Sequence, residues 1–183
     1  MKFVALLSLV LAPLALASCP TTEVLFARGT FEPQGDGWII GPFLHKDAAA
    51  TLAESSFYNV VYPASPDFNT STPVGTADMM RRITEQAKAC PETEFVLTGY
   101  SQGVMVIHGV ELSADLKQWV KAVVSFGDPC KWRAGYTWPI DSVNVWDKCV
   151  EDPVCTGGTG SILNHLSYMA NTDEAVDFIR ARV

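Results

Sequence analysis

The sequence predicts an α/β fold in which a central five-stranded parallel sheet is covered by helices on both faces. Short apolar runs rich in β-branched residues are bounded by turn residues, and helical patterns lie between these runs. Strands that alternate with helices favour a parallel sheet that is buried on both sides. In addition, 48% of the 183 residues are hydrophobic and 18% are charged, which predicts a packed core.

The expected strands are the apolar runs Glu23–Ala27, Tyr58–Tyr62, Glu94–Thr98, Val120–Phe126 and Val143–Trp146. The clearest helical pattern begins with Thr72 as N-cap and Pro73 as the first helical residue, and its apolar residues recur every three or four positions as far as Ala87. A second helix is expected over about Gln102–Ala114, and a last one begins near Thr172. In such sheets reactive side chains gather at the carboxyl ends of the strands.

Residues 1–17 have the pattern of an export signal: Lys2, an apolar stretch, and the small-residue triplet Ala15-Leu16-Ala17. An uncleaved membrane anchor is the alternative, but Pro13 within a short apolar run disfavours a spanning helix. No later run approaches the ~20 apolar residues that cross a bilayer. We therefore expect a secreted, extracellular protein with one domain over residues 18–183 and no integral membrane segment.

The net charge and the cysteines limit the kinds of partner and ligand that the chain is expected to bind. Thirteen Lys and Arg against twenty Asp and Glu give a net charge of −7, which becomes −8 when Lys2 is removed with the signal. This charge disfavours nucleic acid and anionic membranes as partners. All five cysteines lie after the signal, where disulfides can form, and one thiol is left over. Their spacing matches no zinc pattern, so we expect no metal. We also expect the protein to be a monomer.

The stretch Gly99-Tyr100-Ser101-Gln102-Gly103 joins an expected strand to an apolar helix. This is G-x-S-x-G in the strand–turn–helix setting that its mechanism requires. A sharp turn lifts the hydroxyl of Ser101 clear of the sheet, and glycines avoid collisions with the neighbouring strand and helix. The amides that open the helix then point at developing negative charge. Ser101 is therefore predicted to be a nucleophile.

A nucleophilic serine needs a base, which follows the serine in chain order in this architecture. His165 lies in a loop-like stretch after the last expected strand, and it is the predicted base. His45 precedes the serine, and His108 falls within the following helix, where we expect a surface or packing role.

Three acidic residues, Asp147, Glu151 and Asp152, follow the last expected strand and could orient the histidine. Asp152 is favoured because Cys149 and Cys155 bracket it, and a disulfide there would hold the carboxylate toward the imidazole. The same spacing also fits an ordinary structural disulfide.

Six motifs give the sequence a wider resemblance: Ala27-Arg28-Gly29-Thr30-Phe31-Glu32-Pro33-Gln34, Val74-Gly75-Thr76-Ala77-Asp78, Gly99-Tyr100-Ser101-Gln102-Gly103, Phe126-Gly127-Asp128-Pro129, Asp152-Pro153-Val154-Cys155 and His165-Leu166-Ser167-Tyr168. With them the chain resembles the cutinase family, small serine esterases that include acetylxylan esterases, over essentially all of residues 18–183. The resemblance implies a minimal, lidless α/β-hydrolase with an exposed site, a triad of Ser101, Asp152 and His165, and no cofactor.

The resemblance also implies an oxyanion hole. Gln102 would supply the backbone N–H that follows the nucleophile, and Thr30 would supply a backbone N–H and a hydroxyl. Two disulfides are implied as well, Cys19 with Cys90 and Cys149 with Cys155, which leave Cys130 as a buried, inert thiol.

One departure from the family pattern concerns the acid loop. Only Val150 and Glu151 stand between Cys149 and Asp152, one residue fewer than is usual in the family. The intervals from Asp152 to Cys155 and to His165 match the family, which favours Asp152, while the shortened loop keeps Glu151 as a minority candidate.

The expected function is that of a secreted serine esterase that hydrolyses cutin or related aliphatic polyesters and short-chain esters through an acyl-enzyme on Ser101. An acetylxylan esterase, or a catalytically silent secreted binding protein of the same fold, are the alternatives. Gly157-Gly158-Thr159-Gly160 is interpreted as a rim of the site, and Ile162 and Leu163 as acyl contacts or core residues. Asn69-Thr70-Ser71 is an N-glycosylation sequon in an expected loop.

Overall fold

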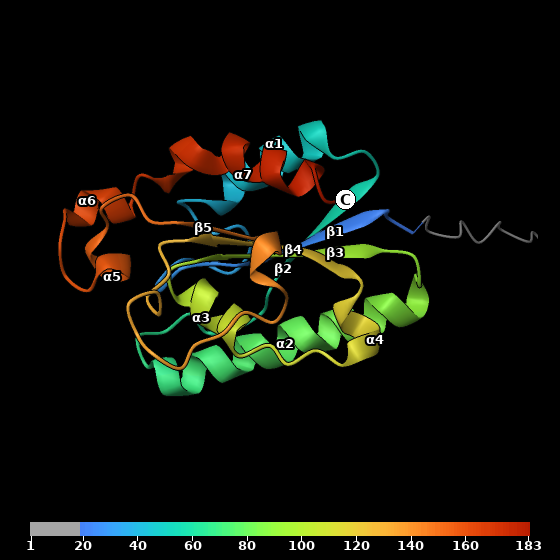
Figure 1. Cartoon of the computed structure of the whole chain (residues 1–183), viewed down its shortest axis with the longest axis horizontal. Coiled ribbons are helices and arrows are strands. Elements are labelled where there is room, and N and C mark those ends of the chain that lie inside the picture. The colour runs from blue at the N-terminus through green and yellow to red at the C-terminus, as the bar shows by residue number, and fades with distance from the viewer. Residues whose placement is uncertain (1–18) are drawn as a thin grey trace, which may run out of the picture.

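A computed structural model of the chain describes residues 19–183, and the expected export signal at residues 1–17 lies outside them. Five parallel strands form one sheet in the order β2-β1-β3-β4-β5 (Figure 1). Their bounds are β1 (Thr22–Ala27), β2 (Ser55–Asn59), β3 (Glu94–Tyr100), β4 (Val120–Phe126) and β5 (Val145–Lys148). The predicted five-stranded parallel sheet is confirmed.

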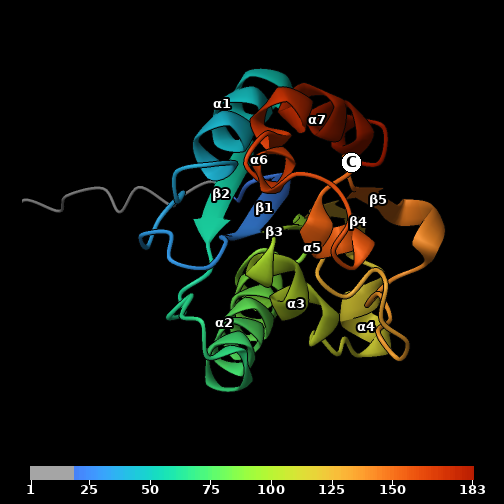
Figure 2. The ribbon, with the colours of Figure 1, turned by 90° about the vertical axis from the view of Figure 1, so that its left-hand side faces the viewer.

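Helices cover both faces of the sheet, as the sequence predicts. One layer holds α1 (Gly41–Thr51) and α7 (Thr172–Arg180), and the opposite layer holds α2 (Phe68–Ala89), α3 (Gln102–His108) and α4 (Ala114–Lys117) (Figure 1). The short helices α5 (Pro153–Thr156) and α6 (Ile162–His165) lie beyond the carboxyl ends of the strands. Figure 2 looks at this end, which also carries the start of α3. Two single 3₁₀ turns span Ser142–Asn144 and Tyr168–Asn171.

The period-two alternation of the strands divides the core into two layers. In β1, Val24 and Phe26 pack with the α1 and α7 side, whereas Leu25 and Ala27 pack with the α2 and α3 side. All four are essentially inaccessible to solvent. Burial of one such Val, Leu or Phe side chain contributes roughly 1.5–3 kcal/mol, so both helical layers hold the sheet in place.

The two edge strands differ from the prediction. β2 covers Ser55–Asn59 instead of Tyr58–Tyr62, and β5 covers Val145–Lys148 instead of Val143–Trp146. Each pairs with a neighbour on one side only. An edge strand needs less apolar character than a central one, so the apolar runs do not mark its ends.

The start of α2 also differs from the prediction, since the helix begins at Phe68 and Pro73 lies inside it. Ser71 donates its N–H to the carbonyl of Asp67 at 2.9 Å, and its buried hydroxyl accepts from the N–H of Ser65 at 3.1 Å. These bonds hold an extra turn before Pro73, and the cost is one helical hydrogen bond that the proline cannot make. The sequon at Asn69 therefore lies in an exposed helical turn instead of a loop.

The expected helix over Gln102–Ala114 is two helices, because α3 ends at His108 and α4 starts at Ala114. A Cβ at Gly109 would come 2.6 Å from Oγ1 of Thr76, so this residue lets the chain leave α3 closely against α2. The sequence reasoning missed α1, whose buried positions are few and whose apolar pattern is weak. Within residues 19–183, none of the helices combines the length and apolar character needed to cross a lipid bilayer.

Both implied disulfides form. Cys19 pairs with Cys90 across a separation of 71 residues, and Cys149 pairs with Cys155 across six. Cys130 is the free cysteine of the described residues, and it is buried. Burial raises the pKa of its thiol to about 11, so the thiol stays neutral at ordinary pH.

Candidate functional site

Ser101 lies at the turn between β3 and α3, with φ 53° and ψ −118°. A non-glycine residue rarely adopts this backbone conformation, and such strain concentrates at functional sites. Gly103 makes the turn possible, because a Cβ there would stand 1.8 Å from the carbonyl oxygen of Ala27. Close packing of α3 on the end of β1 therefore fixes the turn that presents Ser101.

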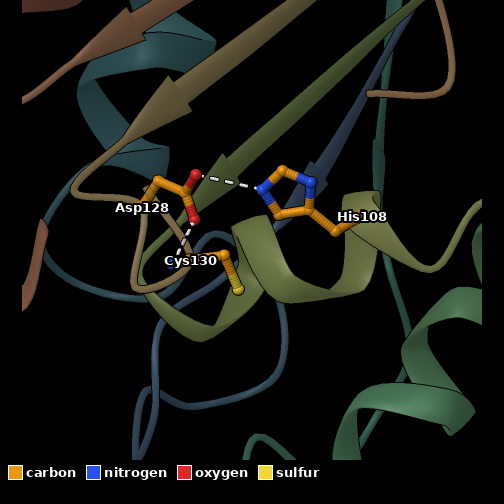
Figure 3. Close-up of side chains that lie close together, drawn as sticks. All are labelled: His108, Asp128 and Cys130. Carbon is orange, nitrogen blue, oxygen red and sulfur yellow. Dashed lines mark hydrogen bonds and ion pairs between the residues drawn. The ribbon is translucent and has the colours of Figure 1, made fainter. Parts of the chain in front are cut away.

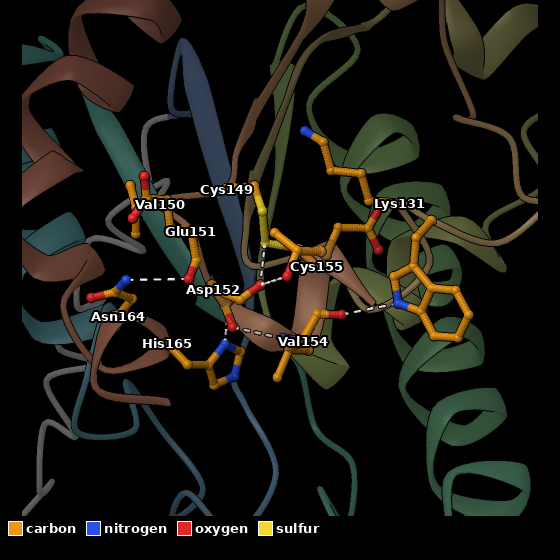
Figure 4. Close-up of a disulfide and its surroundings, with 12 residues drawn as sticks. Lys131, Cys149, Val150, Glu151, Asp152, Val154, Cys155, Asn164 and His165 are labelled. Carbon is orange, nitrogen blue, oxygen red and sulfur yellow. Dashed lines mark hydrogen bonds and ion pairs between the residues drawn. A yellow bond between two sulfur atoms is a disulfide. The ribbon is translucent and has the colours of Figure 1, made fainter. Parts of the chain in front are cut away.

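Asp152 and His165 form a buried acid–base pair at the same end of the sheet. Nδ1 of His165 lies 2.6 Å from Oδ2 of Asp152, whose side chain is fully buried (Figure 4). The carboxylate also accepts from the hydroxyl of Tyr168 at 2.9 Å and from the N–H of Val154 at 2.8 Å. Burial, followed by the bond to Asp152, raises the pKa of Tyr168, so its phenol stays a proton donor. Three donors thus stabilise the carboxylate charge.

The other two candidate acids are not brought to His165. Glu151 is exposed, and its main-chain carbonyl accepts from the side-chain amide of Asn164 at 3.2 Å (Figure 4). Asp147 accepts from Nζ of Lys131 at 2.5 Å and from Oγ of Ser125 at 2.8 Å. The one-residue shortening of the loop therefore leaves Asp152 against the imidazole.

The turn that follows β4 connects the serine to the acid–base pair. The carbonyl of Phe126 accepts the N–H of Ser101 at 2.9 Å. A Cβ at Gly127 would lie 2.7 Å from Oδ2 of Asp152 and 3.1 Å from Cε1 of His165, so only glycine fits there. Within residues 19–183, Ser101 and His165 make no direct hydrogen bond, and such bonds commonly tighten only when substrate is bound.

Thr30 and Gln102 stand at the ends of the elements that flank Ser101. The backbone N–H and the hydroxyl of Thr30 have no hydrogen-bond partner among residues 19–183, and both are therefore available to a ligand. Its loop is held by Glu32, whose buried carboxylate accepts from the N–H of Gly29 at 2.7 Å. Nε2 of Gln102 donates to the carbonyl of Ser65 at 2.7 Å, which anchors the first residue of α3.

A cleft of about 350 Å³ opens beside Ser101, and it is lined by Phe68, Ser101, Gln102, Pro129, Trp132, Arg133, Pro153, Val154, Gly157 and Gly158. Nε1 of Trp132 donates to the carbonyl of Val154 at 3.2 Å, which joins the loop after β4 to the acid loop. Gly157 and Gly158 line this cleft, so these two glycines form part of the rim that the sequence predicts. Ile162 and Leu163 are 58% and 70% exposed, so the alternative that they are core residues is wrong.

One group in the described part of the chain has side chains that could hold a metal ion. His108, Asp128 and Cys130 offer ligand atoms within 4.8 Å of one another (Figure 3). Sequence spacing did not reveal this cluster, because the fold brings the end of α3 to the turn after β4. Sequence reasoning also assigned no role to Tyr168, although the motif His165-Leu166-Ser167-Tyr168 contains it.

Comparison with known proteins identifies the family. The family model described as Cutinase matches residues 18–183. The chain belongs to the cutinase family. A cutinase of Trichoderma harzianum, cut1, is 36% identical over 91% of this chain and 68% of its own length. The carboxylesterase Culp1 of Mycobacterium tuberculosis is 33% identical over 90% of this chain and 82% of its own.

Among solved structures, the cutinase of Trichoderma reesei in complex with a phosphonate inhibitor superposes with a TM-score of 0.77. It is 34% identical, and the match covers 88% of this chain and 75% of that one. The expected minimal α/β-hydrolase fold is thereby confirmed. As a member of the cutinase family, with named cutinases and carboxylesterases among its relatives, the chain is a carboxylic ester hydrolase.

Proposed function

We propose that this cutinase-family protein is a secreted serine esterase in which Ser101, Asp152 and His165 form the triad and no cofactor takes part. The observation that carries the proposal is the 2.6 Å hydrogen bond between His165 and the buried Asp152, at the end of the sheet where the strained turn presents Ser101. The two disulfides suit an extracellular protein.

Each side chain has one role in the first half of the reaction. Because Nδ1–H of His165 donates to Asp152, the neutral imidazole keeps its lone pair on Nε2. That nitrogen takes the proton of Ser101 as Oγ attacks the ester carbonyl, and Asp152 stabilises the imidazolium that forms. The tetrahedral oxyanion is bound by the backbone N–H of Gln102 and by the backbone N–H and hydroxyl of Thr30.

The first half ends when Nε2–H of His165 gives its proton to the leaving alkoxide and the acyl group stays on Oγ of Ser101. In the second half a water molecule enters from the open cleft, and His165 takes its proton as the water oxygen attacks the acyl carbonyl. The bond between the acyl carbon and Oγ then breaks, Nε2–H of His165 returns the proton to Oγ of Ser101, and the acyl group leaves as a carboxylic acid.

An insoluble aliphatic polyester such as cutin is the substrate class that the surface favours. Large apolar side chains stand exposed around the site end of the molecule, among them Phe31 at 74% and Leu163 at 70% exposed. Exposed apolar residues that gather beside a cleft are typical of binding surfaces. Short-chain soluble esters should also react, because the cleft is open.

Two alternatives to this function are distinguished by separate measurements. An acetylxylan esterase would hydrolyse acetate esters and lose rate steeply with longer acyl chains. Rates across acyl chains from acetate to palmitate, with release of monomers from cutin and of acetate from xylan, separate these activities. The second alternative, a silent binding protein, would leave Ser101 unlabelled by a fluorophosphonate probe.

The decisive variant is Ser101→Ala. We expect it to fold, to lose the fluorophosphonate label and to lose nearly all esterase activity, because enzymes without their nucleophile keep only about 10³–10⁴-fold acceleration over water. Ser113→Ala is the matched control, since Ser113 is exposed and its side chain caps nothing. A correctly folded Ser101→Ala protein that is as active as the unmodified protein would contradict the proposed mechanism.

A further inference from the structure

The imidazole of His108 is buried at the end of α3, and its side chain is only 4% exposed. Nδ1 lies 2.9 Å from the carbonyl oxygen of Thr137, and Nε2 lies 3.0 Å from Oδ2 of Asp128 (Figure 3). A carbonyl can only accept a hydrogen bond, and an ionised carboxylate does the same, so beside an ionised Asp128 both ring nitrogens donate. The geometry therefore suits an imidazolium, paired with a carboxylate that is itself 2% exposed.

The surroundings of the ring suit a cation. The ring of Trp138 lies 4.2 Å from it, centroid to centroid, and the ring of Tyr136 meets it edge-on at 5.5 Å. An aromatic face attracts positive charge. Burial lowers the pKa of His108, but the bonds to Asp128 and to the carbonyl of Thr137 more than offset it and hold that pKa above its usual value.

Few other titratable groups face the ring. Cys130, beside Asp128, carries a neutral thiol, and Asp147 at the end of β5 adds a weaker attraction. Tyr136 faces it from the loop after β4. On the side of α2, the groove that His108 helps to line is bounded by Phe68, Asn69, Thr72, Pro73, Thr76, Ala77 and Met80, none of them charged. Among residues 19–183, Asp128 is therefore the carboxylate bonded to the imidazolium.

Asp128 is the last residue of the turn Phe126-Gly127-Asp128, and this turn contacts every member of the proposed triad. Phe126 accepts the N–H of Ser101, and Gly127 packs against both Asp152 and His165. Oδ1 of Asp128 accepts the N–H of Cys130 at 2.7 Å and so shapes the start of the loop that carries Trp132 into the cleft. His108 is thus bonded to a turn that contacts Ser101 on one side and the Asp152–His165 pair on the other.

We propose that His108 is a positioning residue for ester hydrolysis: its imidazolium, bonded to Asp128, holds helix α3 and the turn after β4 in register, and thereby keeps Ser101 aligned with Asp152 and His165. This inference rests on the proposed function. It makes α3 an element fixed at both ends, by the turn at Ser101 and by the ion pair at His108.

Nε2 of His108 and Oδ2 of Asp128 lie at an ordinary hydrogen-bond distance of 3.0 Å, so a single proton between them satisfies both atoms. A zinc ion held by the same residues is the rival interpretation, and the metal content of the purified protein tests it.

The ion pair should also impose a pH dependence. A histidine whose pKa is raised by folding stabilises the native arrangement fully below its unfolded pKa of ~6.5, and this stabilisation is lost as the pH rises through the folded value. We therefore expect kcat to fall on the alkaline side as His108 loses its proton.

The test compares His108→Gln, Asp128→Asn and the double variant. Each single variant should lower kcat about tenfold to 100-fold with little change in KM, because a misplacement of about 1 Å away from the reacting atoms costs this much. The double variant replaces the ion pair by an amide pair, so it should recover part of kcat and lack the alkaline fall. An alkaline fall that persists unchanged in the double variant would overturn the proposal.

A second readout does not depend on turnover. In the inactive Ser101→Ala protein, ¹⁵N NMR of the His108 ring should show both nitrogens protonated at pH 6.5, and hydrogen exchange of α3 should quicken when Asp128→Asn is added. A neutral ring, or stoichiometric zinc in the purified protein, would contradict the inference while leaving the proposed function intact. Ile179→Val in α7 is the control, since it loosens the opposite layer and should leave kcat unchanged.

Discussion

Asp152 and Glu151 are adjacent in the chain, yet their surroundings differ completely. Asp152 is fully buried and receives hydrogen bonds from His165, Tyr168 and the N–H of Val154. Glu151 has a left-handed backbone with φ 52°, and its side chain is exposed. Burial and hydrogen bonding therefore separate the two neighbouring carboxylates, and Asp152 is the one that meets the imidazole.

We expect Asp152→Asn to lower kcat by about 10⁴-fold, the loss seen when a triad acid becomes an amide and the histidine adopts the wrong tautomer. Glu151→Gln should change kcat less than twofold, because an exposed carboxylate does not touch the imidazole. Steady-state kinetics on a soluble short-chain ester measure both. The reverse ordering of the two variants would move the acid by one residue.

Thr30 offers a second contrast at the residue scale, because its hydroxyl is aimed at no protein partner within residues 19–183. A donor that acts only on the oxyanion lowers the barrier without helping substrate to bind. Thr30→Ala should therefore reduce kcat roughly tenfold to 100-fold, less than a complete loss of a donor site because its backbone N–H survives. Thr30→Ser should retain most of kcat. An effect confined to KM would assign Thr30 to substrate binding instead.

The two disulfides hold different elements and should have separable effects. Cys19–Cys90 closes 71 residues and ties the start of β1 to the end of α2, whereas Cys149–Cys155 closes only six and encloses the acid loop. Loop-closure entropy predicts roughly 4 kcal/mol of stabilisation for the first and roughly 2 kcal/mol for the second.

The effects of losing each disulfide on kcat should follow the opposite order to the effects on stability. Replacing Cys149 and Cys155 by alanine should remove most of kcat at 25 °C, because Asp152 loses its support. Replacing Cys19 and Cys90 should lower the urea midpoint more than replacing Cys149 and Cys155 does, but it should leave kcat nearly unchanged. Urea unfolding and initial rates on the two double variants check this. A larger kcat loss in the Cys19 and Cys90 variant would show that the acid loop holds its shape without the disulfide.

The elements also show how far the sequence alone could go. The three central strands lie within two residues of their expected bounds, because burial on both sides forces continuous apolar runs there. Both edge strands were predicted with shifted bounds, because an edge strand needs less apolar character than a central one. The start of α2 was missed because a side-chain hydrogen bond, from the N–H of Ser65 to Ser71, supports the turn before Pro73.

For the candidate site, motifs selected Ser101, Asp152 and His165 as candidates, and the fold brings Asp152 against His165. They could not find the contact of His108 with Asp128, because a separation of 20 residues carries no signal until the fold brings α3 to the turn after β4. The same holds for Tyr168, whose hydroxyl reaches Asp152 only after the loop closes on itself.

At the scale of the whole molecule, every part of the candidate site lies at one end. Thr30, Ser101 and the turn at Gly127 follow β1, β3 and β4, and α5 and α6 close the same end around Asp152 and His165 (Figure 2). Parallel strands bring their carboxyl ends to one edge of the sheet, so the connections that follow the strands can assemble the site there. The long helices α1 and α2 cover opposite faces of the sheet (Figure 1).

This layout leaves no element to act as a lid within residues 19–183. The segments over the site end are α5 and α6, which have four residues each, and α6 is fixed in place by the bond from His165 to Asp152. Ser101 lines a cleft whose rim includes Gly157 and Gly158. A serine that is already reachable gains nothing from a lipid surface that would open a cover.

The enzyme should therefore show no interfacial activation. The rate on a short-chain ester, followed as its concentration passes the solubility limit, should rise along one smooth saturating curve, because the same open site meets dissolved and emulsified substrate alike. Ser101→Ala gives the background rate at each concentration. A sharp rise in rate when droplets appear would mean that some segment covers Ser101 in solution, and it would contradict the open cleft.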